Sequence, residues 1–109
     1  MIVHNFSWLG KDVEIGEGTK IEPFSFIPNG VTIGNNCFIG PHVCFTNDKY
    51  PKAKGKWIQL DTVVEDNVSI GANSTILPGI VLRKGCRIAA HSIVTKDVEK
   101  GELWLKKSR

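Results

Sequence analysis

The segment from Val31 to Asp48 reads VTIGNN CFIGPH VCFTND, three six-residue units in direct succession. Each unit has a small or β-branched residue at its first place, an aliphatic or aromatic residue at its third place, and turn-forming residues after that. The third places are held by Ile33, Ile39 and Phe45. Alternation of inward and outward side chains has the period of a β-strand, so each unit predicts one short strand followed by a corner.

The six-residue count continues over most of the chain. The third places form two series: Val3, Leu9, Ile15, Ile21, Ile27, Ile33, Ile39 and Phe45, and then Val64, Ile70, Ile76, Leu82, Ile88 and Val94. A helix does not fit, because a 3.6-residue period would scatter these side chains and each glycine would cost about 1 kcal/mol. Strands this short have no local partner, but stacked coils pair each strand with those above and below. The sequence therefore predicts an all-β fold of stacked coils.

The two series are out of step, because the distance from Phe45 to Val64 exceeds three units by one residue. We therefore expect residues 49–61, KYPKAKGKWIQLD, to leave the coil as a loop. Such excursions are commonly functional. With its lysines and the aromatic Tyr50 and Trp57, this loop is expected to pack over a site or on a neighbouring subunit, with plain surface decoration as the alternative. The predicted organisation is a coil domain over residues 1–98 and a C-terminal cap and tail over residues 99–109.

Composition limits the classes of function. The chain has 109 residues, enough for one domain, and its net charge of +3 is spread out, which argues against nucleic-acid and membrane partners. The N-terminus does not read as a signal peptide and no apolar stretch reaches membrane-spanning length, so we expect a cytoplasmic protein. Cys37, Cys44 and Cys86 form no CxxC pair and are interpreted as small buried thiols in a reducing compartment, with a nucleophile or metal role as the alternative.

These units resemble the hexapeptide-repeat acyltransferases, which fold as left-handed parallel β-helices with three units per triangular coil. The resemblance implies about 4–5 coils here, and the left hand is taken from it. The stretch from Cys37 to Lys54, CFIGPHVCFTNDKYPKAK, is similar to the nucleotide-3-amino-sugar N-acetyltransferases through its Phe-Thr-Asn-Asp and Tyr-Pro residues. It implies an acetyl-CoA-dependent N-acetyltransferase acting on an amino sugar or its nucleotide, shortened by about two coils between Ile27 and Phe45.

Acyl transfer to an amine needs groups that orient the amine and stabilise the oxyanion. Asn47 is a candidate catalytic residue, because an amide can accept from the amine and donate to an oxygen at once. His42 is a candidate base, because imidazole titrates near neutral pH. A corner turn and a solvated corner are the respective structural alternatives. Asp48, Tyr50 and Trp57 are the candidate substrate-binding residues.

The resemblance also implies acetyl-CoA as co-substrate, lying in a groove between two β-helices. The small residues that match positions along its pantetheine arm are Gly71, Ala72, Ala89 and Ala90. The basic residues that could bind its phosphates are Lys96 and the tail residues Lys106, Lys107 and Arg109. Small corner residues kept for tight packing are the alternative. The three histidines lie apart in register and offer no set of three imidazoles, so no metal site is expected.

A homotrimer is expected, because a chain with one groove wall cannot enclose a ligand and a closed ring gives three equal sites. Its other partner would be a small amino-sugar acceptor, with no nucleic acid and no membrane. Two further hypotheses stay open. One is an O-acetyltransferase that uses His42 as base, and the other is a non-catalytic trimeric β-helix scaffold.

Overall fold

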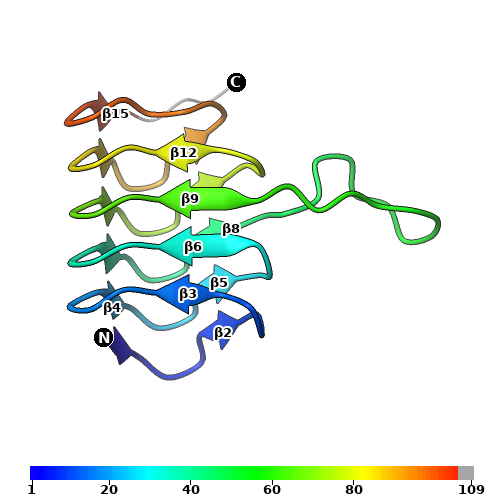
Figure 1. The fold of residues 1–109 in the computed structure, drawn as a ribbon, viewed down its shortest axis with the longest axis horizontal. Helices are drawn as coiled ribbons and strands as arrows, with labels where there is room; N and C mark the ends of the chain where they lie inside the picture. The colour runs from blue at the N-terminus through cyan, green and yellow to red at the C-terminus, as the bar shows by residue number, and fades with distance from the viewer. Residues whose placement is uncertain (106–109) are drawn as a thin grey trace.

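The computed structural model describes residues 1–105, which form β-strands of two or three residues wound into a triangular prism (Figure 1). In this view the front strands run to the left and the chain returns behind them as it rises from the N-terminus, so the coil is left-handed. Among residues 1–105 no helix is long and apolar enough to cross a membrane. The cytoplasmic location stays a prediction.

Each side of the prism is one parallel sheet. Sheet A contains β1 (Ile2–Val3), β4 (Lys20–Ile21), β7 (Phe38–Ile39), β10 (Ser69–Ile70), β13 (Arg87–Ile88) and β15 (Leu103–Trp104). Sheet B contains β2 (Trp8–Leu9), β5 (Phe26–Ile27), β8 (Cys44–Phe45), β11 (Thr75–Ile76) and β14 (Ile93–Val94). Sheet C contains β3 (Glu14–Ile15), β6 (Val31–Ile33), β9 (Thr62–Val64) and β12 (Val81–Leu82). The chain visits the sheets in the order A, B, C, and we name the turns between them the A–B, B–C and C–A corners.

Strand pairing repeats at a fixed sequence interval. Lys20 pairs with Phe38, eighteen residues or three units later, whereas Phe38 pairs with Ser69, thirty-one residues later. The difference of thirteen equals the length of residues 49–61, which leave the prism at the B–C corner between β8 and β9 (Figure 1). The all-β parallel β-helix with one excursion loop is thus confirmed.

The third-place side chains form the core. Ile39, Phe45, Ile70 and Ile76 are fully buried, and the outward residue between the inward ones of each strand is mostly exposed. Serine and threonine also occur inside, but their hydroxyls bind backbone groups of the corners. Thr19, for example, donates to Gly34 O at 2.7 Å and accepts from Cys37 N at 3.0 Å. The stack therefore buries an apolar column without leaving these hydroxyls unpaired.

The C–A corner is held by a ladder of side chains that bind the backbone of the adjacent coil. Asn35 Oδ1 accepts from Glu17 N at 2.8 Å, and Asp66 Oδ1 accepts from Asn35 N at 2.8 Å. One coil further, Glu65 Oε1 accepts from Lys84 N at 2.9 Å. Asn36 and Asn67 have positive φ, which asparagine tolerates. Polar side chains at this corner are thus used to fasten one coil to the next.

The helix continues beyond the six-residue series. Five coils are followed by β15, which pairs with β13 and begins a sixth, one strand more than the 4–5 coils expected. The six-residue period did not predict β15, because the last complete coil is two residues shorter than the others. Leu82 therefore bridges Val98, which lies only sixteen residues later in the sequence. Asp97 Oδ1 accepts from Val81 N at 2.9 Å in the shortened corner.

Trp104, which is 7% exposed, extends the sheet A column at the C-terminal end of the described prism. The division of the chain at residue 98 stays a prediction. The tail residues Lys106, Lys107 and Arg109 lie outside the described part.

Candidate functional site

Asn47 lies at the base of the loop, where the chain leaves the prism. Its Nδ2 donates to Asn29 O at 3.0 Å, and its own carbonyl accepts from Leu60 N at 3.0 Å, where the chain returns. Next to it, Asp48 and Gln59 form an antiparallel bridge. The loop is therefore closed at its base, and the Asn47 side chain is anchored to the preceding coil, with its Oδ1 left as the group that can accept from a ligand.

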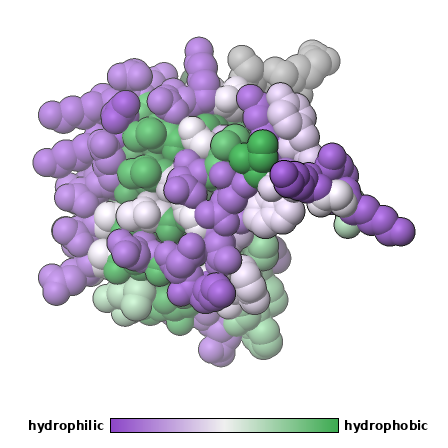
Figure 2. All heavy atoms as spheres, turned by 45° about the vertical axis from the view of Figure 1, so that its right-hand side comes forward, coloured by the Kyte–Doolittle hydropathy of each residue, from purple (hydrophilic) through white to green (hydrophobic). Residues whose placement is uncertain are grey.

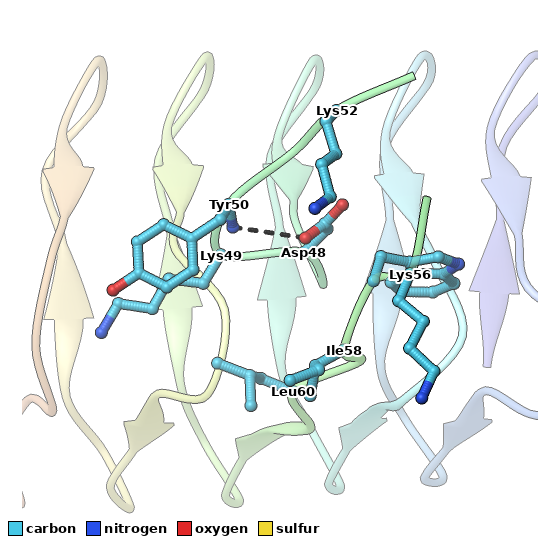
Figure 3. Close-up of a pocket in the computed structure, with 8 residues that line it drawn as sticks. Asp48, Lys49, Tyr50, Lys52, Lys56, Ile58 and Leu60 are labelled. Carbon is cyan, nitrogen blue, oxygen red and sulfur yellow. Dashed lines mark hydrogen bonds between the residues drawn. The ribbon is translucent and has the colours of Figure 1, made fainter. Parts of the chain in front are cut away.

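A pocket of about 350 Å³ opens between the outgoing and returning arms of the loop. Its lining is basic, aromatic and aliphatic: Asp48, Lys49, Tyr50, Lys52, Lys56, Trp57, Ile58 and Leu60. In Figure 3, Lys49 and Tyr50 lie on one side, Lys56 on the other, and Ile58 and Leu60 between them. Tyr50 N donates to Asp48 Oδ1 at 3.2 Å, and Lys49 Nζ lies 5.8 Å from the centre of the Tyr50 ring.

Two further hollows continue from this pocket along the B–C corner. One, of about 240 Å³, is lined by Thr46, Asp48, Lys49, Pro51, Leu77, Pro78 and Thr95. The next, of about 630 Å³, shares Lys49, Pro78 and Thr95 and reaches Lys96. Lys49 borders all three, so the hollows adjoin one another, and we name them together the groove of the B–C corner. Figure 2, which brings this side forward, shows hydrophilic residues along the left edge and on the protruding loop at the right. Hydrophobic residues lie on the surface between them.

His42 lies at the other end of β8, on the A–B corner. It is exposed, with φ of 60°, and its ring stacks on that of Phe24 at 5.0 Å between centroids. Phe24 in turn stacks on Phe6 at 5.2 Å, and both have positive φ as well. Asn73 and His91 have positive φ in the A–B corners of the later coils, so the left-handed backbone is a feature of this corner. Because the three rings stack, the His42 ring is held in a column of rings at this corner.

The four small residues predicted to line a cofactor lie on this same A–B corner, in the coils that follow His42. A Cβ on Gly40 would come within 2.8 Å of Ala72 N, and one on Gly71 within 2.7 Å of Ala90 Cα. Ala72 O accepts from His91 N at 2.8 Å. Close coil-to-coil approach thus explains the two glycines structurally, while the outward sides of Ala72 and Ala90 remain accessible.

The predicted site residues fall into two groups on one chain. The B–C corner holds Asn47, Asp48, Tyr50, Trp57 and Lys96, and the A–B corner holds His42, Gly71, Ala72, Ala89 and Ala90. The width of sheet B separates the two groups, so His42 and Asn47 do not converge on one point in a single chain.

Sequence reasoning missed Lys49, Lys52 and Lys56 as lining residues, and Asn29 as the anchor of Asn47. The signals were present: three of the loop lysines flank its two aromatic residues, and Asn29 precedes Asn47 by one full coil.

The thiols lie apart from the loop pocket. Burial raises the pKa of Cys37 and of Cys44, and burial, followed by the charge of Glu102, raises the pKa of Cys86 to about 11. Thiols of raised pKa are poor nucleophiles. Within residues 1–105, no three His, Cys, Asp or Glu side chains are grouped so as to hold a metal ion.

Comparison with known proteins identifies the repeat. The family described as bacterial transferase hexapeptide (six repeats) matches residues 12–47 and 61–96, and so skips the loop. A Schizosaccharomyces pombe protein that carries an acetyltransferase name is 38% identical over 73 residues, 62% of this chain and 35% of that protein. Bifunctional protein GlmU of Geotalea uraniireducens is 31% identical over 99 residues, 88% of this chain and 21% of that protein.

The chain thus spans about a third or less of the length of these curated relatives. Among solved structures, a hexapeptide-repeat containing acetyltransferase of Vibrio cholerae, complexed with acetyl coenzyme A, matches with a TM-score of 0.78 and 29% identity. The match covers 89% of this chain and 57% of that one. With the family repeat extending over more than half of its residues, the chain belongs to the hexapeptide-repeat transferases.

Proposed function

We propose that the protein is an acetyl-CoA-dependent N-acetyltransferase that acts on an amino sugar. Family membership and the acetyl-CoA complex of the Vibrio cholerae relative support the acetyl donor. The Phe-Thr-Asn-Asp resemblance supports an amine acceptor. The observation that carries the proposal is the anchored amide of Asn47 at the base of the loop, between Thr46 and Asp48, which line the groove.

The reaction needs no covalent enzyme intermediate. The lone pair of the uncharged amine attacks the thioester carbonyl carbon, a C–N bond forms, and the tetrahedral oxyanion collapses with cleavage of the C–S bond. Coenzyme A leaves as thiolate, which takes up the proton that the amine nitrogen gives up. Asn47 Oδ1 would accept from the attacking N–H and so orient its lone pair, because Nδ2 is engaged by Asn29 O. Such positioning is a large part of acyl-transfer catalysis.

Sheet B is the face through which copies would meet in the proposed homotrimer. The outward residues of sheet B are all uncharged: Trp8, Phe26, Cys44, Thr75 and Ile93. The outward residues of sheets A and C, in contrast, include Lys20, Arg87 and Glu14. In a three-fold ring built on this face, the A–B corner of each copy adjoins the B–C corner of its neighbour. The two groups of predicted residues would then form one site between two copies.

The position of His42 supports a second candidate function, that of an O-acetyltransferase. The His42 ring is fixed by stacking on that of Phe24. A hydroxyl acceptor needs a general base more than an amine does. Acetylation of hydroxyl acceptors that is lost in His42→Ala would favour this second function.

The test is release of coenzyme A thiol from acetyl-CoA in the presence of a panel of amino sugars. Asn47→Ala is expected to lower kcat by about a hundredfold, on the scale of losing one catalytic hydrogen-bonding group. Asn5→Ala, an exposed asparagine on the first coil, is the matched control and should retain full turnover. Equal turnover in the two variants would remove Asn47 from the chemistry. No heat of binding with coenzyme A would instead indicate a scaffold.

A further inference from the structure

We infer that the loop of residues 49–61 is a docking surface for an anionic lipid bilayer. The loop would lie in the headgroup region, with its lysines on anionic headgroups and its apolar side chains at the boundary with the acyl chains. This inference goes beyond the proposed function, because it involves neither acetyl-CoA nor an acceptor.

The loop stands clear of the prism. The chain leaves after β8, returns at β9 and extends away from all three sheets between them (Figure 1). Every residue from 49 to 59 is exposed. The base is closed by the hydrogen bond from Leu60 N to Asn47 O and by the bridge of Asp48 with Gln59. The loop is therefore placed to touch a flat surface ahead of the sheets.

Positive charge is concentrated on the loop. Its four lysines are Lys49, Lys52, Lys54 and Lys56, and residues 49–60 contain no acidic residue. The remaining ten basic residues of the chain are outnumbered by its eleven acidic ones. Within residues 1–105, no carboxylate lies within ion-pair distance of these lysines. The expectation of no membrane partner follows from the net charge of the whole chain, which conceals this patch. Each lysine close to an anionic bilayer strengthens binding.

Large apolar side chains lie beside the lysines. Tyr50 is 76% exposed, Ile58 74% and Trp57 53%. Tryptophan and tyrosine are enriched at the headgroup level of membranes, because their rings are apolar and carry one polar group. An aliphatic side chain as exposed as Ile58 is stabilised when it leaves water for the edge of the acyl chains. Lysines, amphipathic rings and an aliphatic side chain on one protruding loop match the chemistry of an anionic bilayer surface.

The same residues favour a bilayer over a nucleic acid. The loop contains no arginine, although arginine is the preferred basic residue for nucleic-acid recognition. Ile58 has no group that could bind a phosphate or a base by hydrogen bonding. The apolar stems of lysines can lie along a headgroup layer while the ammonium groups stay in water. An exposed isoleucine among lysines is thus explained by a bilayer and left without a role by a nucleic acid.

Flotation with lipid vesicles tests binding of the full chain. Vesicles of phosphatidylcholine mixed with phosphatidylglycerol supply the anionic surface, and vesicles of pure phosphatidylcholine are the uncharged control. The protein should float with the mixed vesicles and stay largely in solution with the pure ones. Higher salt should lower the bound fraction, because it screens the attraction between the lysines and the headgroups.

Paired lysine variants test whether the loop makes the contact. Lys52→Gln with Lys56→Gln should lower the partition coefficient between mixed vesicles and water about thirtyfold, because one lysine near an anionic surface contributes about fivefold. Lys84→Gln with Lys100→Gln makes the same charge change at exposed lysines of the C–A corner. This control pair should leave the partition coefficient unchanged.

Apolar variants test insertion. Ile58→Ser should lower the partition coefficient about fivefold or more. Ile2→Ser, at an isoleucine of sheet A that is 55% exposed, is the matched control and should have no effect. Vesicles with bromine-labelled acyl chains should quench the fluorescence of the unaltered protein but not that of Trp57→Phe, because Trp8 lies on sheet B and Trp104 is buried.

The inference is overturned if the mixed vesicles bind no more protein than the pure ones, or if both lysine pairs lower binding alike. Single-stranded RNA that binds more tightly than the mixed vesicles, with no effect of Ile58→Ser, would assign the lysines to a nucleic acid and overturn it. Trp57 fluorescence that is shielded from iodide before vesicles are added would show that the loop packs on a second copy, which also contradicts the inference. Acetyl transfer without vesicle binding contradicts this inference alone and leaves the transferase proposal in place.

Discussion

The C–A corner and the B–C corner turn the same prism and both bind neighbouring coils through side chains, but the B–C corner also carries the loop, whose rings lie in solvent. At the C–A corner, Asn35 and Asp66 bind backbone N–H groups of the neighbouring coil. At the B–C corner, the loop places Tyr50, Trp57 and Ile58 in solvent around a hollow. A corner whose polar groups bind one another fastens the coils, whereas one that leaves rings and ammonium groups facing a hollow has them available for a ligand.

The largest expected difference is between a core isoleucine and a loop isoleucine. Ile39→Ala removes a fully buried side chain from the sheet A column and should lower the free energy of unfolding by about 2–5 kcal/mol. Ile58→Ala removes a side chain that is 74% exposed and should change it by about 0.5 kcal/mol or less. Denaturant unfolding measures both. Similar losses in the two variants would mean that the loop is part of the folding core.

A smaller difference is expected between two carboxylates that each accept from a backbone N–H. Asp66→Ala leaves Asn35 N without its acceptor between two coils and should cost about 1 kcal/mol of folding stability. Asp48→Ala breaks only a contact within the loop, to Tyr50 N, and should affect ligand affinity with little change in stability. Thermal melting and ligand titration of both variants test this, and a stability loss confined to Asp48→Ala would reverse the assignment of the corners.

The smallest effect concerns the thiol of Cys86 in the core. Its pKa of about 11 lies above that of an exposed thiol, mainly because of burial. Between about pH 9 and 11 the folded chain therefore keeps a proton that the unfolded chain loses, so the stabilisation is present below pH 9 and is lost as pH rises through 11. Cys86→Val introduces at this position the valine that the preceding coil has at Val68. Its denaturation midpoint should fall less steeply from pH 9 to 11 than that of the unaltered protein, and parallel slopes would contradict this.

The sequence predicted the regular parts because each unit repeats the same local requirement. Ile33, Ile39, Ile70 and Ile76 are all buried, as their period implies. The six-residue count failed at β15, because the last coil is shortened. The Asp97 side chain closes its corner by accepting a hydrogen bond from Val81 N. Local period specifies a coil only while its length is constant.

The candidate site was less accessible to sequence reasoning. Asn47 and the loop were recognised as an interruption, but which lysines line its pocket depends on how the two arms come together. The repeat already assigns His42 and Asn47 to the corners of successive units, so the width of sheet B between them follows from it. Whether they meet depends on a second copy of the chain.

The central claim, a transferase site formed between two copies across sheet B, is tested most directly by subunit complementation. Asn47→Ala disables the B–C corner, and Ala90→Trp places a bulky side chain at an exposed position of the A–B corner. Each variant alone should release little thiol from acetyl-CoA. Co-expressed in equal amounts, they should recover about a quarter of the wild-type activity, because each mixed ring can pair two intact corners from different copies. Mixed assemblies that stay as inactive as either variant would contradict the claim.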